Sequence, residues 1–187
     1  MSRIEELQHE AVELLQSVIN TPSLSGEENQ TAALIKKWLE KHGVSCKQQR
    51  NNVYAITKHE DPSKPYLLLN SHHDTVLPNS GYTRDPYKAA IEDGKLYGLG
   101  SNDAGGALVC LLTTFVYFYE QENMAYNLVV AATAEEETSG DYGLNSLLKT
   151  LPNINTAIVG EPTQMHLAVA EKGLVVFDAI ISGTASH

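Results

Sequence analysis

The sequence predicts an α/β domain in which a largely parallel central sheet is flanked by helices. Short apolar segments typical of buried strands alternate along the chain with helical patterns, and this alternation favours parallel strands joined by helices. Four of the strands, at residues 66–69, 95–97, 128–130 and 157–159, lead directly into side chains that can bind metals. Because the carboxyl ends of parallel strands share one edge of a sheet, we expect a single site built from four strand ends.

Two amphipathic helices are expected at the start of the chain. Apolar residues recur at helical spacing over residues 4–18, until the polar segment around Pro22 breaks the pattern. A second helical pattern follows, in which Ser25 is the expected N-cap and Glu28 closes a capping box. This second helix is expected to end at His42, which a glycine follows.

Strands and a buried helix make up the middle of the chain. Residues 53–56 and 66–69 have the composition of strands. Residues 78–93 are rich in turn-forming residues, and we expect them to form part of the rim of the site. A glycine-rich segment at residues 98–106 leads into residues 107–119, which are apolar nearly all round. Such a pattern is typical of a helix buried against a sheet.

The second half of the chain continues the alternation. Strands are expected at residues 128–133 and 157–159, on either side of a helix around residues 142–149. Residues 174–181 have the pattern of one more strand, and the sequence stops soon afterwards at His187. A domain seldom ends on a new strand, so we expect this chain to be the N-terminal part of a longer protein.

Composition restricts the classes of function. The chain has 187 residues, 42% of them apolar, which is enough for one domain with a buried core. Its formal charge of −10 argues against a nucleic acid or an anionic membrane as partner. The longest apolar stretch, residues 107–119, is shorter than the ~20 residues of a membrane span. Two separated cysteines and a polar N-terminus fit a cytoplasmic protein without a disulfide framework.

His72 and Asp74 are the first candidate site residues. They lie two positions apart just after a strand, which suits a metal ligand and the carboxylate that accepts its second N–H. For His73, between them, a solvated position is the simpler interpretation. Asp103 follows the glycine-rich segment and precedes a helix, where capping that helix is the commoner role for an aspartate and binding a metal is the alternative.

Three consecutive acids, Glu135, Glu136 and Glu137, indicate a functional site more strongly than Asp103 does. Together in one pocket they would repel one another, so either they extend into water or a cation stabilises them. Their position after a buried strand delivers them to the same edge as His72, which favours a functional role. Glu161, at the end of the next strand, is open to the same two interpretations.

Other catalytic patterns fit poorly. Gly98 and Gly100 begin like a dinucleotide fingerprint, but Asp103 occupies the position of the third glycine. The sequence contains no GxxxxGK phosphate loop, no GxSxG nucleophile elbow and no HExxH helix. One histidine with several carboxylates instead favours one or two divalent cations held mainly by oxygen.

Taken together, these residues resemble the M20 metallopeptidase family of dizinc hydrolases. The family includes acetylornithine deacetylase, succinyl-diaminopimelate desuccinylase, aminoacylase and glutamate carboxypeptidases. The resemblance covers essentially the whole chain in family order, and its four motifs are specific only in combination. The matching segments are residues 71–76 with the S/G-H-x-D-x-V pattern, residues 98–106 with the second aspartate, residues 134–139 with the paired glutamates, and residues 159–163 with Gly-Glu-Pro.

The resemblance implies a site for two metals. His72 and Glu161 would hold one ion and Glu137 the other, with Asp103 bridging both. Zinc is the expected metal, two ions per full-length subunit, although carboxylate-rich sites also accept Co²⁺ or Mn²⁺. The family's last metal-binding histidine lies near the C-terminus of a chain about twice this length. Without it, we expect the 187-residue chain alone to be weakly active or inactive.

The resemblance also implies three catalytic roles. Asp74 would orient the metal-binding histidine, and Glu136 would act as the general base that takes a proton from water and returns it to the leaving amine. His187 matches a histidine that stabilises the oxyanion, commonly in the partner subunit of a dimer. Glu135 stands where the family usually has aspartate. The residues after the run keep Glu136 and Glu137 in their family positions.

The resemblance further implies the domain organisation and the substrate. Residues 1–172 would form the N-terminal part of a three-layer, zinc-peptidase-like catalytic domain, and residues 173–187 the start of an α+β lid and dimerisation domain. The motifs are most similar to the acetylornithine deacetylase branch, which implies hydrolysis of an N-acyl amino acid such as N-acetylornithine. A desuccinylase or a metal-dependent dipeptidase or carboxypeptidase is the alternative enzyme. A non-enzymatic domain with a structural metal is the alternative of another class.

Overall fold

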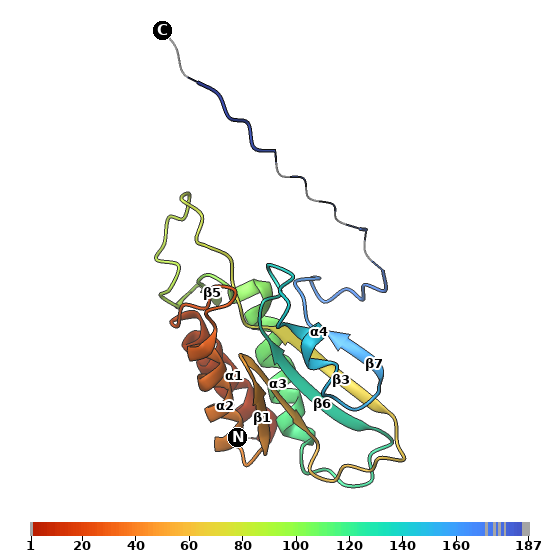
Figure 1. Ribbon diagram of the computed structural model, residues 1–187. Helices are drawn as coiled ribbons and strands as arrows, with labels where there is room; N and C mark the ends of the chain where they lie inside the picture. The colour runs from red at the N-terminus through yellow and green to blue at the C-terminus, as the bar shows by residue number, and fades with distance from the viewer. Residues whose placement is uncertain (1, 171, 174, 176, 178, 185–187) are drawn as a thin grey trace.

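The computed structural model describes residues 2–170, 172–173, 175, 177 and 179–184. A five-stranded sheet with the strand order β1-β2-β6-β3-β7 forms its centre (Figure 1). β3 runs parallel to both β6 and β7, whereas β2 is antiparallel to β6 and β1 is antiparallel to β2. The strands are β1 (Cys46–Gln49), β2 (Asn52–Ile56), β3 (Tyr66–His72), β6 (Asn127–Thr133) and β7 (Ile154–Val159).

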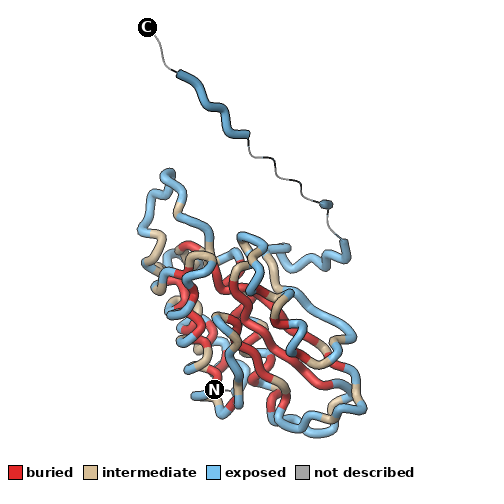
Figure 2. Tube along the Cα trace, in the orientation of Figure 1, coloured by how far each residue is buried: buried red, intermediate tan, exposed pale blue. Residues whose placement is uncertain are grey.

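Helices cover both faces of this sheet, as the sequence predicts. The larger core cluster joins one face to α1 (Arg3–Ile19), α2 (Asn29–Lys41) and α3 (Gly106–Phe118). On the other face, the short helix α4 (Leu144–Leu147) buries Leu147 against Tyr54, Leu68 and Val129. The buried residues therefore follow the sheet and the sides of the helices that face it (Figure 2). The expected α/β fold, with three layers and a largely parallel centre, is confirmed.

The apolar helix α3 is the most deeply packed helix. Leu112 and Phe115 are fully buried, because α3 lies between the sheet and α1. Its beginning approaches α1 closely at Gly105, where a Cβ atom would overlap the side chain of Leu15. Within the described ranges, no helix is both long enough and apolar enough to cross a membrane.

One of the four expected strands does not belong to the central sheet. β5 (Lys95–Tyr97) pairs with β4 (Ala90–Glu92) in a separate two-stranded sheet. Asp93 and Gly94 connect them, with φ angles of 50° and 72°. Positive φ at both positions is typical of the tight type I′ hairpin turn, for which Asp-Gly is a preferred sequence. This local turn pairs β5 with its immediate neighbour, so the prediction of four strand ends at one sheet edge is wrong for this strand.

The expected capping box of the second helix is also absent. Glu28 occupies the N-cap of α2 and makes no capping hydrogen bond with its side chain. The Ser25 hydroxyl donates instead to Asp74, and the Glu28 carboxylate accepts from residues 51 and 135, far away in the sequence. Tertiary contacts thus replace the local pairing that the sequence pattern predicts.

Three further differences concern the edges of the fold. β1 is not predicted from the sequence; it is a four-residue strand whose side chains are only partly covered. The helix expected at residues 142–149 is reduced to α4, because Gly143 and the Ser146 hydroxyl, which bonds the Gly143 carbonyl, favour a turn. The strand expected at residues 174–181 falls partly outside the described residues. The described residues of that stretch form no regular element and are exposed.

Candidate metal centre

The candidate site is centred on His72, the last residue of β3. Its imidazole is almost completely buried, with a relative exposure of 1%. The His72 Nε2 atom lies 3.1 Å from Asp103 Oδ1, 3.8 Å from Glu161 Oε2 and 3.9 Å from Glu136 Oε2. Three carboxylates from three different segments therefore surround one ring nitrogen.

Parallel pairing brings two of these segments to His72. The strands β3 and β6 are in register from Tyr66 to His72, and His72 lies opposite Thr133, so the acids after β6 emerge beside the imidazole. On the other side of β3, the Gly160 N–H donates to the Asn70 carbonyl at 2.7 Å. That bond extends the pairing of β7 by one residue, which delivers Glu161 to the same edge.

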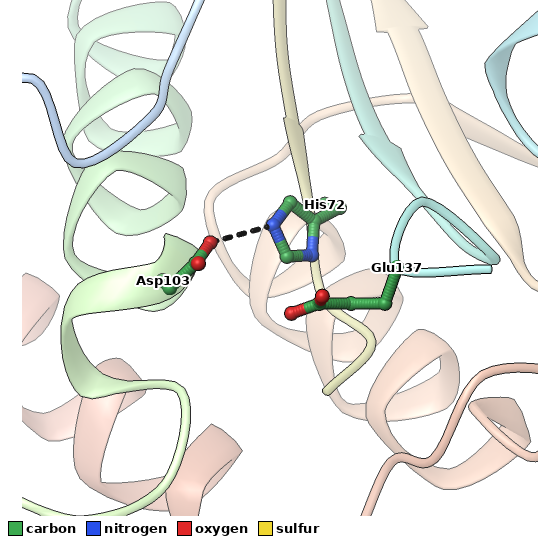
Figure 3. Close-up of side chains that lie close together, drawn as sticks. All are labelled: His72, Asp103 and Glu137. Atoms are coloured by element: carbon green, nitrogen blue, oxygen red, sulfur yellow. Dashed lines mark hydrogen bonds and ion pairs between the residues drawn. The ribbon is translucent and has the colours of Figure 1, made fainter. Parts of the chain in front are cut away.

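Asp103 reaches the site from a helix start. It lies in the distorted turn Ser101–Gly105 that precedes α3, with non-helical φ and ψ angles of −114° and 100°. No side-chain capping bond is present at the start of α3. Asp103 is instead directed toward His72 (Figure 3). The simpler interpretation of Asp103 as a helix cap is therefore wrong.

The three consecutive glutamates separate in space. Glu137 points into the site, where one oxygen of its carboxylate, one of Asp103 and one ring nitrogen of His72 all lie within 4.8 Å of one another (Figure 3). Glu136 is exposed on the site's surface. Glu135 takes a φ of 56°, which residues with a Cβ seldom adopt, and its carboxylate accepts the Tyr142 N–H. This turn lets only the second and third glutamates face His72.

Asp74 holds these segments together through the hydrogen bonds of its buried carboxylate. Its carboxylate, only 1% exposed, accepts hydrogen bonds from the Ser25 hydroxyl at 2.7 Å and from the backbone N–H groups of Glu136 and Glu137 at 3.1 Å each. One oxygen lies 3.4 Å from His72 Nδ1, which is closer, at 3.0 Å, to the Asp74 carbonyl oxygen. Burial opposes ionisation, but these partners lower the pKa of Asp74.

His73 is not solvated, contrary to the prediction from sequence. It is 3% exposed, and its ring nitrogens lie 2.8 Å from the Thr31 hydroxyl and 2.9 Å from the Asn51 carbonyl oxygen. Burial lowers the pKa of His73, so a neutral ring donates one N–H to Asn51 and accepts from Thr31. This histidine ties α2 to the end of β3.

The charges in the site shift the pKa values of His72 and of the glutamates around it. Burial alone would lower the pKa of His72, but the bond to Asp74 and the charges of Asp74 and Glu161 raise it to about 9. Burial raises the pKa of Glu137 and of Glu161, and the surrounding carboxylates raise both further. Such an excess of acids around one imidazole is a set of donors that a divalent cation would neutralise.

A cavity of about 270 Å³ opens beside this cluster. His72, Glu136 and Glu161 line it together with neutral polar residues, among them Asn70, Thr133 and Asn145. The cavity therefore combines the acids of the centre with neutral hydrogen-bonding groups, an arrangement that suits a small polar molecule. His187, the remaining predicted catalytic residue, lies outside the described residues.

Comparison with known proteins places this fold in a family. The family described as "Peptidase family M20/M25/M40" matches residues 68–176. The chain is 31% identical over 188 residues to acetylornithine deacetylase of Shigella sonnei, covering 94% of this chain and 49% of that protein. It is 27% identical over 193 residues to succinyl-diaminopimelate desuccinylase of Rickettsia bellii, covering 92% of this chain and 49% of that protein.

The fold also resembles a solved structure of the same family. The crystal structure of an M20 family metallo-carboxypeptidase from Sulfolobus solfataricus superimposes with a TM-score of 0.66 and 25% identity, over 86% of this chain and 37% of that one. The chain spans about half the length of the curated relatives it matches. The family match extends from the middle of β3 beyond β7 and includes every acid of the candidate centre. This chain belongs to peptidase family M20/M25/M40.

Proposed function

We propose that this chain carries the metal centre of a metal-dependent amidohydrolase that removes the acyl group from an N-acyl amino acid. The observation that carries the proposal is the convergence of His72, Asp103 and Glu137, whose ligand atoms lie within 4.8 Å of one another. An imidazole with carboxylates suits Zn²⁺, and Co²⁺ or Mn²⁺ are chemically acceptable alternatives. Membership of a peptidase family supports hydrolysis as the reaction.

The proposal assigns each ligand to one of two ions. His72 and Glu161 would hold the first ion and Glu137 the second, and Asp103 would contribute to both. The short distances from His72 Nε2 to Asp103 and Glu161 support a shared position for these three side chains. Asp74, on the far side of the imidazole, keeps the ring oriented through its contacts with Nδ1.

Glu136 is the proposed general base. A bound divalent cation would supply positive charge that lowers the pKa of water and stabilises negative charge on the attacked carbonyl oxygen. Glu136 is exposed to the cavity, and its Oε2 lies 3.9 Å from His72 Nε2, so it can reach a water molecule beside the ligands. It takes the proton of the attacking water and returns it to the leaving amine.

The substrate class rests on the named relatives. Acetylornithine deacetylase is 31% identical over almost the whole chain, which favours N-acetylornithine or a similar N-acyl amino acid. Succinyl-diaminopimelate is the alternative that the second relative favours, and the superimposed carboxypeptidase favours a dipeptide-like substrate. The chain spans about half the length of the two curated relatives. For the whole protein we propose a cytoplasmic homodimer with two zinc ions per subunit.

Metal stoichiometry tests the centre directly. After loading with Zn²⁺ and dialysis, we expect about one tightly bound ion per chain, because the ligands of the first ion are present here. His72→Ala and Glu161→Ala should lose this ion. His59→Ala is the matched control, because this histidine is partly exposed, away from the centre, and its removal should leave the stoichiometry unchanged. Zinc retained by His72→Ala, or absent from the unmodified chain, would contradict the proposal.

A structural cation is the competing hypothesis, and metal removal separates it from catalysis. In the full-length protein, chelation should abolish hydrolysis of acylated amino acids while circular dichroism shows an intact fold. Restoring Zn²⁺ should restore the activity. Unfolding on chelation, in a protein that never hydrolysed these amides, would support the structural role instead.

A further inference from the structure

Glu28 is a buried carboxylate that the proposed mechanism does not use. It lies at the start of α2 and is fully buried, with a relative exposure of 0%. Its Oε1 atom accepts the Gly26 N–H at 2.6 Å and the Glu135 N–H at 3.1 Å. Its Oε2 atom accepts an N–H of the Asn51 side chain at 2.7 Å. A carboxylate removed from water is retained only where such donors compensate for the lost hydration.

The bond to the Glu135 N–H is one of three backbone hydrogen bonds that hold the acidic turn, residues 135–137. Glu135, Glu136 and Glu137 present three consecutive backbone N–H groups, of which the first bonds Glu28 and the other two bond Asp74. Two buried carboxylates, from segments distant in the sequence, therefore hold the whole turn by its backbone. The turn begins at the unusual φ of Glu135, a conformation that persists only when surrounding contacts enforce it.

We propose that Glu28 is a positioning residue, which fixes the backbone at Glu135 so that the side chains of Glu136 and Glu137 point into the centre. The roles of those two side chains rest on the proposed function. The anchoring itself does not, because it concerns only backbone hydrogen bonds that exist without a metal. Asp74 does not take this place: its carboxylate accepts from Glu136, Glu137 and Ser25, whereas the Glu135 N–H donates to Glu28.

Three variants isolate this role. Glu28→Ala removes the acceptor of the Glu135 N–H. Glu28→Gln keeps an oxygen at the Oε1 position, and the Asn51 amide can turn to accept from the new NH₂ group, so it should restore the anchoring. Thr31→Val is the control in the same helix: this buried hydroxyl contacts His73 and lies 3.0 Å from the Glu28 backbone carbonyl oxygen, but it contacts neither the Glu28 carboxylate nor the acidic turn.

Hydrogen exchange of the metal-free chain measures the anchoring. In Glu28→Ala, the amide protons of residues 135–137 should exchange at least about tenfold faster, because a hydrogen bond to a charged acceptor is lost. Exchange of the α3 amides reports the global stability of each variant and is used to correct for any overall destabilisation. Glu28→Gln and Thr31→Val should leave exchange at residues 135–137 unchanged after that correction. Equal protection of these amides in Glu28→Ala and the unmodified chain would overturn the proposal.

Metal binding then links the anchoring to the centre. With Co²⁺ as the probe, Glu28→Ala should show an altered visible absorption spectrum and at least about tenfold weaker binding, and Glu28→Gln should restore both. An unmodified chain that binds no Co²⁺ would count against the proposed function only, because the exchange result stands without metal. Faster exchange with an unchanged Co²⁺ spectrum would overturn the claim that Glu28 positions Glu137.

Discussion

Asp74 illustrates how single buried residues shape this protein. Its position two residues after His72 predicts one role, the orientation of the imidazole. The structure adds three more contacts, since the same carboxylate accepts the Ser25 hydroxyl and two backbone N–H groups of the acidic turn. Because hydrogen bonds to buried charged groups contribute more than neutral ones, Asp74 and its donors form one energetic unit.

Substitution of Ser25 distinguishes its two interpretations. As a donor to Asp74, Ser25 should contribute about 1–2 kcal/mol to the free energy of unfolding, the amount that Ser25→Ala loses. Ser25→Asp should destabilise the chain further, because a second carboxylate would face Asp74. A helix cap would instead tolerate aspartate.

Urea denaturation of the metal-free chain measures these differences. Ser2 provides the control, because its hydroxyl is the N-cap of α1 in a complete capping box. Ser2→Asp should therefore change the free energy of unfolding by less than about 0.5 kcal/mol. Equal stability of Ser25→Asp and the unmodified chain would show that Ser25 acts as a cap after all.

At the scale of elements, the contact between α1 and α2 contains a buried histidine whose protonated form is disfavoured. The side chain of His42, at the end of α2, is 6% exposed, and its Nε2 lies 3.3 Å from Glu10 Oε2 in α1. Trp38 packs against its ring with a centroid separation of 4.4 Å. Burial lowers the pKa of His42, and Arg3 and Lys41 lower it further, although Glu10 raises it in part.

This shift gives the α1–α2 contact a pH dependence. Unfolded His42 binds a proton near its ordinary pKa of about 6.5, whereas the folded state binds it only at lower pH. The unfolded state therefore holds more protons below about pH 6.5, and the free energy of unfolding decreases as the pH is lowered through that range. In His42→Gln this contribution is absent, so the stability advantage of the unmodified chain should shrink between about pH 7.5 and about pH 5.

Parallel stability profiles of the two chains would contradict this expectation. Chemical denaturation at a series of pH values provides the measurement. Because both chains share the acids and histidines of the candidate centre, the difference between their profiles isolates His42 from those groups.

At the scale of the whole molecule, the sheet has an open edge. β7 is bonded to β3 on one side, and the described residues provide no strand on its other side. Two of its apolar side chains are half exposed: Ile158 at 50% and Val159 at 53%. Exposed edges with apolar side chains promote pairing between molecules, and natural proteins often protect them with lysine.

Ile158→Lys should therefore reduce self-association of this chain at high concentration. Since the substituted side chain is half exposed, the midpoint of thermal unfolding should shift by less than about 5 °C. Sedimentation velocity over a range of concentrations measures the association, and Tyr117→Lys, on the partly exposed surface of α3, is the control. Unchanged association in Ile158→Lys would show that β7 is not the surface responsible.

The sequence by itself determined the class of fold and the order of its main elements. The buried helix α3 and the strands β3 and β6 are long apolar segments with clear limits, so hydrophobic patterning is sufficient to find them. The position of the ligand candidates after β3, β6 and β7 follows from the geometry of parallel sheets. The roles of these residues as ligands, base and orienting group stay predictions.

Only the tertiary structure decided which polar residues pair with one another. Ser25 and Glu28 have the spacing of a capping box, yet their side chains bond Asp74 and Glu135 because the chain brings those partners within reach. For the same reason, His73 is buried between Thr31 and Asn51 instead of solvated. Apolar burial depends on patterns along the chain, whereas a polar bond depends on one partner at one distance, which folding alone provides.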